Sequence, residues 1–232
     1  MGEAIKLKNP LINKPLDLNE WAYKSIKMRI LNNELAPGSQ LNIEIISKEL
    51  NISRTPIREA LLRLKQSGLV IALPCVGFFV CGITTKDFED IFELRHLIET
   101  YAIEKLAPKI TDEELEHLIG ISDRCELMAQ QGNLKEYNHC DIILHGFITD
   151  SLGNKRMRDI YENVYDLLYR MRMYALKSTD NINQSIIEHK KVIESLQKRD
   201  AARARLAMEE HLENIKTRLR LVVKFQDEPI TR

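Results

Sequence analysis

One short stretch, Ser53–Leu64 (SRTPIREALLRL), constrains the fold more than any other part of the chain. Ser53 is suited to cap a helix N-terminus, and the proline that follows in the first turn loses no hydrogen bond there. Ile57, Leu61 and Leu64 then recur at helical spacing and provide one apolar face to bury. We predict a short helix that is buried on one side and cationic at its start, which is the shape that enters a DNA major groove.

The polar face of this helix holds the candidate DNA-contacting residues, namely Ser53, Arg54, Thr55, Arg58 and Arg63. Arginine recognises guanine edges and phosphates with two parallel hydrogen bonds, and hydroxyl groups near a helix N-terminus bind phosphate. The spacing therefore predicts a compact contact surface at the start of the helix.

The flanking sequence predicts a winged helix-turn-helix domain over residues 16–82. One helix is expected over 18–33 and a second, shorter one over 43–50, with a tight connection to the helix that begins at Ser53. Two β-prone runs then flank Pro74–Gly77, which is typical of a hairpin, or wing. Three helices and a hairpin make up this domain.

The remainder, residues 84–225, predicts an all-α domain without strands. Helix-breaking residues and helix-capping residues divide it into helical segments, with a capping box at Thr111 and Glu114. The six expected segments are 85–107, 111–130, 133–151, 154–177, 183–199 and 201–225. Segments of this length joined by short loops are typical of an antiparallel helix bundle. The fold class is therefore mainly α, and we expect the N-terminal 15 residues and the tail after Phe225 to be loose arms.

The distribution of charged and apolar residues limits the cellular compartment and the partners that we expect for the protein. The 232 residues hold 34 Lys and Arg and 34 Asp and Glu, yet residues 1–82 carry 11 basic against 7 acidic side chains. A basic N-terminal part followed by an acidic remainder indicates two modules with different partners. No apolar run is long enough to span a bilayer, the N-terminus does not resemble a signal peptide, and the four cysteines lack metal-type spacing. We expect a cytoplasmic protein with no membrane partner.

Four residues of the second module predict a metal site. Asp141 and His145 are four apart on one helix and so share a face. His189 and His211 lie at equal sequence distance on either side of Asp200, which places them at the same height of an antiparallel pair. Three imidazoles and one carboxylate suit a divalent ion, Zn²⁺ first and Ni²⁺, Co²⁺ or Fe²⁺ as alternatives. Against this stands the ordinary role of helical histidines as surface or hydrogen-bonded core residues.

Arg95 lies beside an apolar stripe in FELRHLIET and is the candidate effector-binding residue. Its guanidinium could hold a carboxylate with two hydrogen bonds. An ion pair with Glu99, four residues on, is the alternative.

With these residues in view, the chain resembles a GntR-family transcriptional regulator of the FadR group, with a C-terminal FCD ligand-binding domain. Leu35–Val70 carries the winged-helix pattern, and three further stretches carry the FCD pattern. They are ELRHLIE (Glu93–Glu99), CDIILHGFITDSLGN (Cys140–Asn154) and EHKKVIESLQKRDAARARLAMEEHL (Glu188–Leu212).

This resemblance implies a homodimer that binds a pseudo-palindromic double-stranded DNA operator, most simply as a repressor. A small carboxylate effector would bind in the bundle, at the metal held by Asp141, His145, His189 and His211, and tune the affinity for DNA. Two departures from the family pattern stand out. Val76 replaces the basic residue usual before the wing glycine, and Leu144 replaces an aromatic residue before the metal histidine.

Two other functions compete with this one. A helical metalloenzyme with an open Zn²⁺ or Fe²⁺ site is the first, but no glutamate is evidently placed as a general base and no HExxH pattern occurs. A DNA-binding protein with a purely structural metal is the second. We expect a regulator and not an enzyme.

Overall fold

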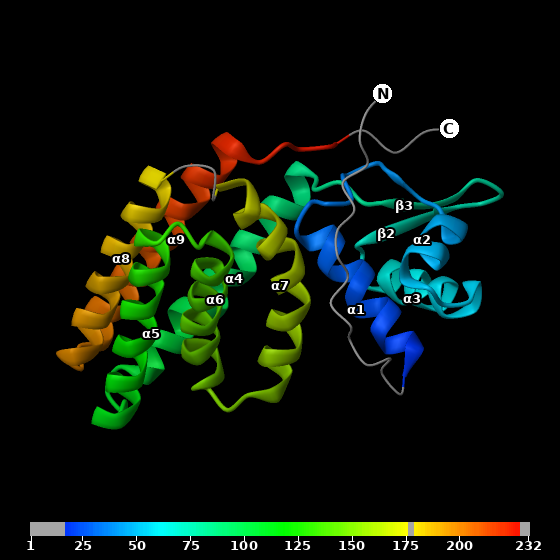
Figure 1. The fold of residues 1–232 in the computed structure, drawn as a ribbon. Coiled ribbons are helices and arrows are strands. Elements are labelled where there is room, and N and C mark those ends of the chain that lie inside the picture. The colour runs from blue at the N-terminus through cyan, green and yellow to red at the C-terminus, as the bar shows by residue number, and fades with distance from the viewer. Residues whose placement is uncertain (1–16, 176–178, 228–232) are drawn as a thin grey trace. The chain divides into compact units, whose positions relative to one another are not determined.

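The computed structural model describes residues 17–175 and 179–227. It divides into two compact units (Figure 1). One consists of the described residues up to Ile30 together with Gly38–Cys81, and the other of Leu31–Pro37 together with the residues from Gly82 onward. We call them the winged unit and the helical unit. Their elements confirm the predicted fold class, a winged helix-turn-helix followed by an antiparallel all-α bundle.

The winged unit contains the predicted helices and hairpin. Its elements in order are α1 (Leu18–Leu31), β1 (Gln40–Leu41), α2 (Ile43–Leu50), α3 (Arg54–Gln66), β2 (Val70–Leu73) and β3 (Gly77–Val80). The apolar positions that share one face of α3, Ile57, Leu61 and Leu64, have no solvent exposure. Burial of three such side chains contributes roughly 1.5–3 kcal/mol each and fixes which face of α3 remains outside.

Local chemistry sets the boundaries between α2 and α3. The side chain of Asn42 accepts hydrogen bonds from two backbone N–H groups at the start of α2. Asn51 ends that helix in the left-handed conformation, at φ 52°, which asparagine adopts more readily than most residues. Ser53 then occupies the N-cap position of α3, although its side chain makes no capping hydrogen bond. Its hydroxyl therefore remains available to another partner.

The sheet has one strand more than the sequence predicted. β3 pairs with β2 as the expected antiparallel hairpin, and on its other edge it pairs with β1. A two-residue strand carries no periodic signal of its own, so its existence depends on the partner strand. The side chain of Gln40 also donates to the carbonyl of Val76 at 3.1 Å and thereby ties β1 to the wing turn.

The helical unit contains the six predicted helices. They are α4 (Thr85–Leu106), α5 (Asp112–Gln130), α6 (Leu134–Asp150), α7 (Lys155–Ala175), α8 (Thr179–Gln197) and α9 (Ala201–Val222). The capping box at Thr111 and Glu114 is present, and a second one, at Thr84 and Asp87, begins α4. The predicted end of the fourth segment, residue 177, lies outside the described residues. In the described ranges no helix is both long and apolar enough to cross a membrane.

The prediction of a loose tail after Phe225 is wrong for the described part of that tail. The ring of Phe225 lies edge-on against Phe88, with centroids 5.4 Å apart. The N–H of Gln226 donates to the carbonyl of Ile83 at 2.9 Å, and the carboxylate of Asp227 accepts from the N–H of Thr85. This segment therefore packs on the start of α4. The expected N-terminal arm and residues 228–232 lie outside the described residues.

Candidate functional site

A layer of buried polar side chains interrupts the core of the helical unit. Along α4, the apolar residues Ile91 and Phe92 belong to one cluster and Ala102 and Ile103 to another. Between them and opposite them on the other helices lie polar side chains that are almost fully buried. They are Arg95, Glu99, Asp141, His145, Arg172, Glu188, His189 and His211. Burying so many charged groups is costly unless each one is paired with a group of opposite charge or a hydrogen-bond partner. The pairs that these side chains form therefore indicate which chemistry the layer can support.

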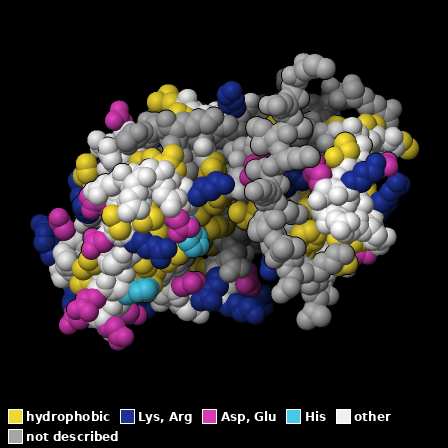
Figure 2. All heavy atoms as spheres, in the orientation of Figure 1, with side chains coloured by type: hydrophobic (Ala, Val, Ile, Leu, Met, Phe, Trp, Pro, Cys, Tyr) yellow, Lys and Arg dark blue, Asp and Glu magenta, His cyan; other side chains and the backbone are white. Residues whose placement is uncertain are grey.

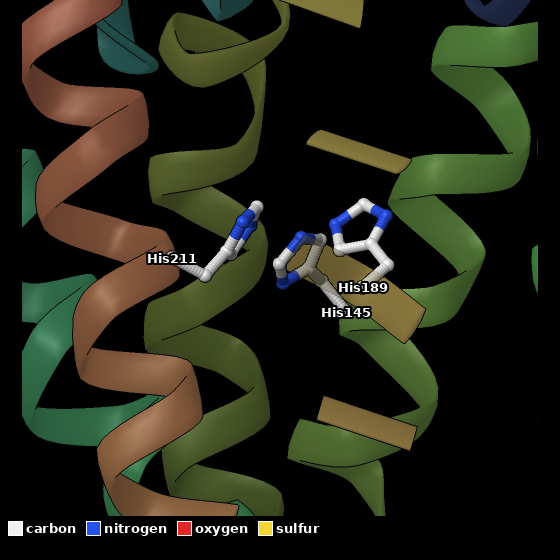
Figure 3. Close-up of side chains that lie close together, drawn as sticks. All are labelled: His145, His189 and His211. Carbon is white, nitrogen blue, oxygen red and sulfur yellow. The ribbon is translucent and has the colours of Figure 1, made fainter. Parts of the chain in front are cut away.

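Three histidines from three helices meet at the centre of this layer (Figure 3). His145 comes from α6, His189 from α8 and His211 from α9, and all three are at most 1% exposed. Their ring centroids lie 4.6–5.2 Å apart. One ligand atom of each ring lies within 4.8 Å of the other two, which is the spacing of donors around a shared ion.

The nitrogens that face the centre of this cluster lack partners. The Nε2 atoms of His145, His189 and His211 are buried and form no hydrogen bond with the residues that the structure describes. Asp141 lies next to them, with its Oδ1 atom 3.5 Å from Nε2 of His189 and its Oδ2 atom 4.0 Å from Nε2 of His145. The structure thus brings together the four residues that the sequence proposed as metal ligands.

Two carboxylates that the sequence did not reveal hold the outer nitrogens of the rings. Glu99 Oε2 lies 2.6 Å from Nδ1 of His145, and Glu188 Oε2 lies 2.9 Å from Nδ1 of His211. A carboxylate at Nδ1 places the proton there and leaves the lone pair at Nε2. Glu188 directly precedes His189, but carboxylates are common on helices, and only the packing shows which of them are buried.

The electrostatics of the layer favour neutral histidines and charged carboxylates. Burial lowers the pKa of His211 to about 4, and burial together with the neighbouring histidines holds the pKa of His189 well below the ordinary value. Burial also opposes ionisation of Glu99, but the adjacent Arg95 charge and His145 hold its pKa well below the ordinary value. Arg218 likewise lowers the pKa of Glu188 to about 2 despite burial. Neutral imidazole and ionised carboxylate are the forms that bind metal.

Two buried arginines neutralise acidic groups of the layer. Arg95 donates from Nε to Glu99 Oε1 at 2.6 Å, which is the alternative role considered for it from the sequence, while its Nη1 atom has no hydrogen-bond partner among the described residues. Arg172 of α7 forms an ion pair with Asp141 through Nη1 and Oδ2. Burial works against the charge of Asp141, but Arg172 and the three neighbouring histidines together outweigh it and lower the pKa of that carboxyl.

A small cavity of about 30 Å³ adjoins the layer, with space for two or three water molecules. Asp141, Arg172 and Arg218 supply its charged lining, and Asn138, Asn181 and Ser185 supply polar groups. Each arginine is paired with a carboxylate, Arg172 with Asp141 and Arg218 with Glu188. A small anion that replaces one of these carboxylates would find a guanidinium group to bind.

The donor set fits a divalent transition metal. Three buried Nε2 atoms that form no hydrogen bond within the described part of the chain converge beside one carboxylate, and carboxylates at Nδ1 orient two of the three rings. Nitrogen-rich sets of this kind suit Zn²⁺, Ni²⁺, Co²⁺ or Fe²⁺, whereas Mg²⁺ and Ca²⁺ prefer oxygen. The carboxylates supply the outer contacts that usually accompany metal-bound histidine.

The second candidate region is the exposed face of α3 in the winged unit. Arg54 and Arg58 lie on this face, and with Thr55 and Lys65 they line a groove of about 1050 Å³ that continues to the wing. Arg54 reaches Glu44 at 3.2 Å but keeps 69% of its side chain exposed. Arg58 is exposed and has no ion pair within the described ranges. Figure 2 shows Lys and Arg side chains on the surface of this unit, at the right of the view.

Arg63 has a different environment from the other basic residues of α3. Its Nη1 atom donates to Glu20 of α1 at 3.0 Å, and its guanidinium lies 4.0 Å from the ring centroid of Tyr23. The side chain therefore packs α3 against α1, although the sequence pattern placed it in the DNA-contacting set. The wing turn carries Cys75 and Val76 and no basic residue, so the positive charge of the groove comes from α3.

Comparisons with known proteins agree with both halves of the fold. The family described as bacterial regulatory proteins, gntR family, matches residues 18–80. The FCD domain matches residues 90–214. These matches cover both the winged unit and the helical unit.

Relatives extend over nearly the whole chain. The HTH-type transcriptional regulator YdhC of Bacillus subtilis (strain 168) is 26% identical over 195 residues, which are 84% of this chain and 87% of that protein. The HTH-type transcriptional repressor RspR of Escherichia coli (strain K12) is 24% identical over 211 residues, 91% of this chain and 92% of that protein. The solved structure of E. coli McbR/YncC shares the fold with a TM-score of 0.75 and 18% identity, covering 89% of this chain and 99% of that one.

Proposed function

Because this chain belongs to the GntR family of transcriptional regulators and carries an FCD domain, we propose that a small organic acid, bound at a metal in the helical unit, controls its affinity for DNA. The single observation that carries this proposal is the convergence of three buried Nε2 atoms, which have no hydrogen-bond partner among the described residues, beside Asp141 and a cavity lined by two arginines. Its relative RspR is a repressor, and repression is the mode we propose here.

In this proposal, α3 recognises the operator. Arg54 and Arg58 would contact bases and phosphates, while Thr55 and the free hydroxyl of Ser53 would contact phosphate at the helix N-terminus. Arg63 would support them indirectly, because its guanidinium holds α3 against α1. A homodimer would present two such helices to a pseudo-palindromic site in cytoplasmic DNA.

The helical unit would provide the effector site. Asp141, His145, His189 and His211 would hold the metal, with Zn²⁺ as the first choice and Ni²⁺, Co²⁺ or Fe²⁺ as alternatives. A bound metal would supply a Lewis-acidic contact for a carboxylate oxygen. Arg172 and Arg218 line the adjoining cavity and would bind the effector's carboxylate in exchange for their present partners, whereas Arg95 is not among the described residues that line it. The small volume of the cavity favours a small acid.

The metal part of this proposal is tested by elemental analysis. His189→Ala combined with His211→Ala should reduce stoichiometric zinc to background while the far-ultraviolet circular dichroism stays helical. His117→Ala combined with His139→Ala removes two histidines outside the cluster and should leave the zinc content unchanged. Retention of stoichiometric metal by the first double variant would eliminate the bundle site.

The regulatory part is tested by operator binding of the zinc-loaded protein in a screen of small organic acids. We expect at least one acid to weaken DNA binding, and only when zinc is present. Two competing functions make different predictions. A structural metal predicts no response to any acid, and a metalloenzyme predicts that the acid is consumed. Light scattering of the same samples should give the mass of a dimer.

A further inference from the structure

The two carboxylates that hold the histidines have different surroundings. Glu99 has no solvent exposure, and its partners Arg95 and Tyr161 are buried with it. Glu188 is bound through both of its oxygens to Arg218, which lines the cavity. One histidine is therefore oriented by a sealed carboxylate, and the other by a carboxylate whose partner faces the cavity.

We propose that Glu188 makes the metal affinity of the site depend on the occupant of the cavity. Glu188 is a positioning residue, because it accepts the Nδ1 proton of His211 and leaves the Nε2 lone pair facing the centre of the cluster. Arg218 holds the same carboxylate from the cavity side. This inference rests on the proposed binding of metal and anion by the helical unit and adds the residue that couples them.

The coupling follows from the sharing of one carboxylate. Arg218 donates to each oxygen of Glu188 at 2.7 Å, and His211 contacts one of them at 2.9 Å. An anion in the cavity competes with Glu188 for the guanidinium and leaves more of the carboxylate charge to His211. The imidazole then becomes a better electron donor, so metal binds more tightly. Thermodynamic linkage requires that bound metal raise the affinity for the anion by the same factor.

Glu99 gives a matched comparison within the same site. It orients His145 as Glu188 orients His211, but its arginine, Arg95, is absent from the described residues that line the cavity. Loss of either carboxylate should therefore weaken metal binding. Only loss of Glu188 should reduce the response to an anion, to the part that comes from direct contact of the anion with the metal.

The first experiment measures zinc affinity by competition with a chromogenic chelator. Glu188→Gln and Glu99→Gln should each weaken zinc binding by about 10–100-fold, the usual effect of losing such an outer contact. Glu210→Gln, which removes an exposed carboxylate paired with Lys191, should leave it unchanged. Nitrogen-15 spectra of the metal-free protein should show the Nδ1–H tautomer of His211 in the wild type and a mixture in Glu188→Gln. An unchanged affinity or tautomer in Glu188→Gln overturns the positioning role.

The second experiment repeats the zinc titrations with acetate as the probe anion. Acetate should tighten zinc binding in the wild type, in Glu99→Gln and in Glu210→Gln, and by a smaller factor in Glu188→Gln, where only direct contact of acetate with the metal remains. Any complexation of zinc by acetate itself affects all four proteins equally and cancels. An acetate response in Glu188→Gln equal to that of the wild type overturns the inference, and so does a wild type that binds zinc but does not respond.

Two further results distinguish failure of the proposed function from failure of this inference alone. A wild type that binds no zinc refutes the metal part of the proposed function and this inference with it, whereas wild-type zinc binding with an unaltered Glu188→Gln refutes the inference alone. Glu188→Asp keeps the charge and should recover part of both the zinc affinity and the acetate response. If Glu188→Gln does not fold, the comparison rests on Arg218→Gln, which should bind zinc with a smaller acetate response than the wild type, and a response equal to that of the wild type overturns the inference.

Discussion

Within α3, neighbouring arginines differ in what they contact. Arg58 is exposed on the groove side and is unpaired within the described ranges, whereas Arg63 donates to Glu20 and lies over the ring of Tyr23. A guanidinium without an internal partner is free to contact DNA. One that bridges two helices contributes to the stability of the unit instead.

This difference predicts opposite effects of two equivalent substitutions. Arg58→Ala should weaken operator binding by about 1–3 kcal/mol, or roughly 5–150-fold, with little change in the free energy of unfolding. Arg63→Ala should lower the free energy of unfolding by about 1 kcal/mol, through loss of the ion pair and the ring contact, with a smaller effect on DNA affinity. Fluorescence anisotropy with operator DNA and urea denaturation measure the two quantities. Equal DNA affinities for Arg58→Ala and the wild type would refute the contact assignment.

The candidate metal ligands could be predicted from the sequence, but their supporting residues could not. Asp141 and His145 share a helix face, and His189 and His211 are equidistant from a bend, so helix geometry alone puts them at one level. Glu99 and Glu188 have no such signature, because a carboxylate on a helix looks the same whether it faces solvent or a histidine. Their role depends on how the helices pack around the polar layer, which is not encoded in the spacing along any one helix.

Among the secondary-structure elements, those with local signals were predicted and those that depend on distant partners were not. All six helices of the helical unit follow from their periodicity, caps and breakers. β1 has two residues and exists only because it pairs with β3. The segment from Phe225 to Asp227 has no regular structure of its own and is held by contacts to the start of α4.

The start of α4 depends on a reciprocal cap that can be tested. The Thr84 hydroxyl accepts from the N–H of Asp87 at 3.0 Å, and the Asp87 carboxylate accepts from the N–H of Thr84 at 2.9 Å. Thr84→Ala leaves the N–H of Asp87 unsatisfied and should lower the free energy of unfolding by about 1 kcal/mol. Thr84→Ser keeps the hydroxyl and should behave like the wild type in the same urea denaturation. A loss of equal size in both variants would mean that the methyl group, and not the cap, is responsible.

For the whole molecule, metal binding should appear as added stability. The buried Nε2 atoms form no hydrogen bond with the described residues of the folded chain, so an ion that binds them binds the folded state and not the unfolded one. Zinc at 100 times its dissociation constant should therefore add about 2.7 kcal/mol to the free energy of unfolding. Differential scanning calorimetry should show a higher melting temperature with zinc and reversal by a chelator. The His189→Ala, His211→Ala double variant should show no zinc response.

The metal-free protein should lose stability in acid, beginning where histidine protonates in the unfolded chain. The pKa of His211 falls from the ordinary 6.5 to about 4 because the ring is buried, so between these values the unfolded chain binds more protons than the folded one. The free energy of unfolding should thus decrease as the pH falls through this window, by about 3 kcal/mol for this group alone. Further loss should follow below pH 4, as Asp141, whose folded pKa is lowered, protonates on unfolding. Urea denaturation from pH 7.5 to pH 4 measures the slope. His211→Gln should reduce it, whereas His139→Gln, an exposed position, should not.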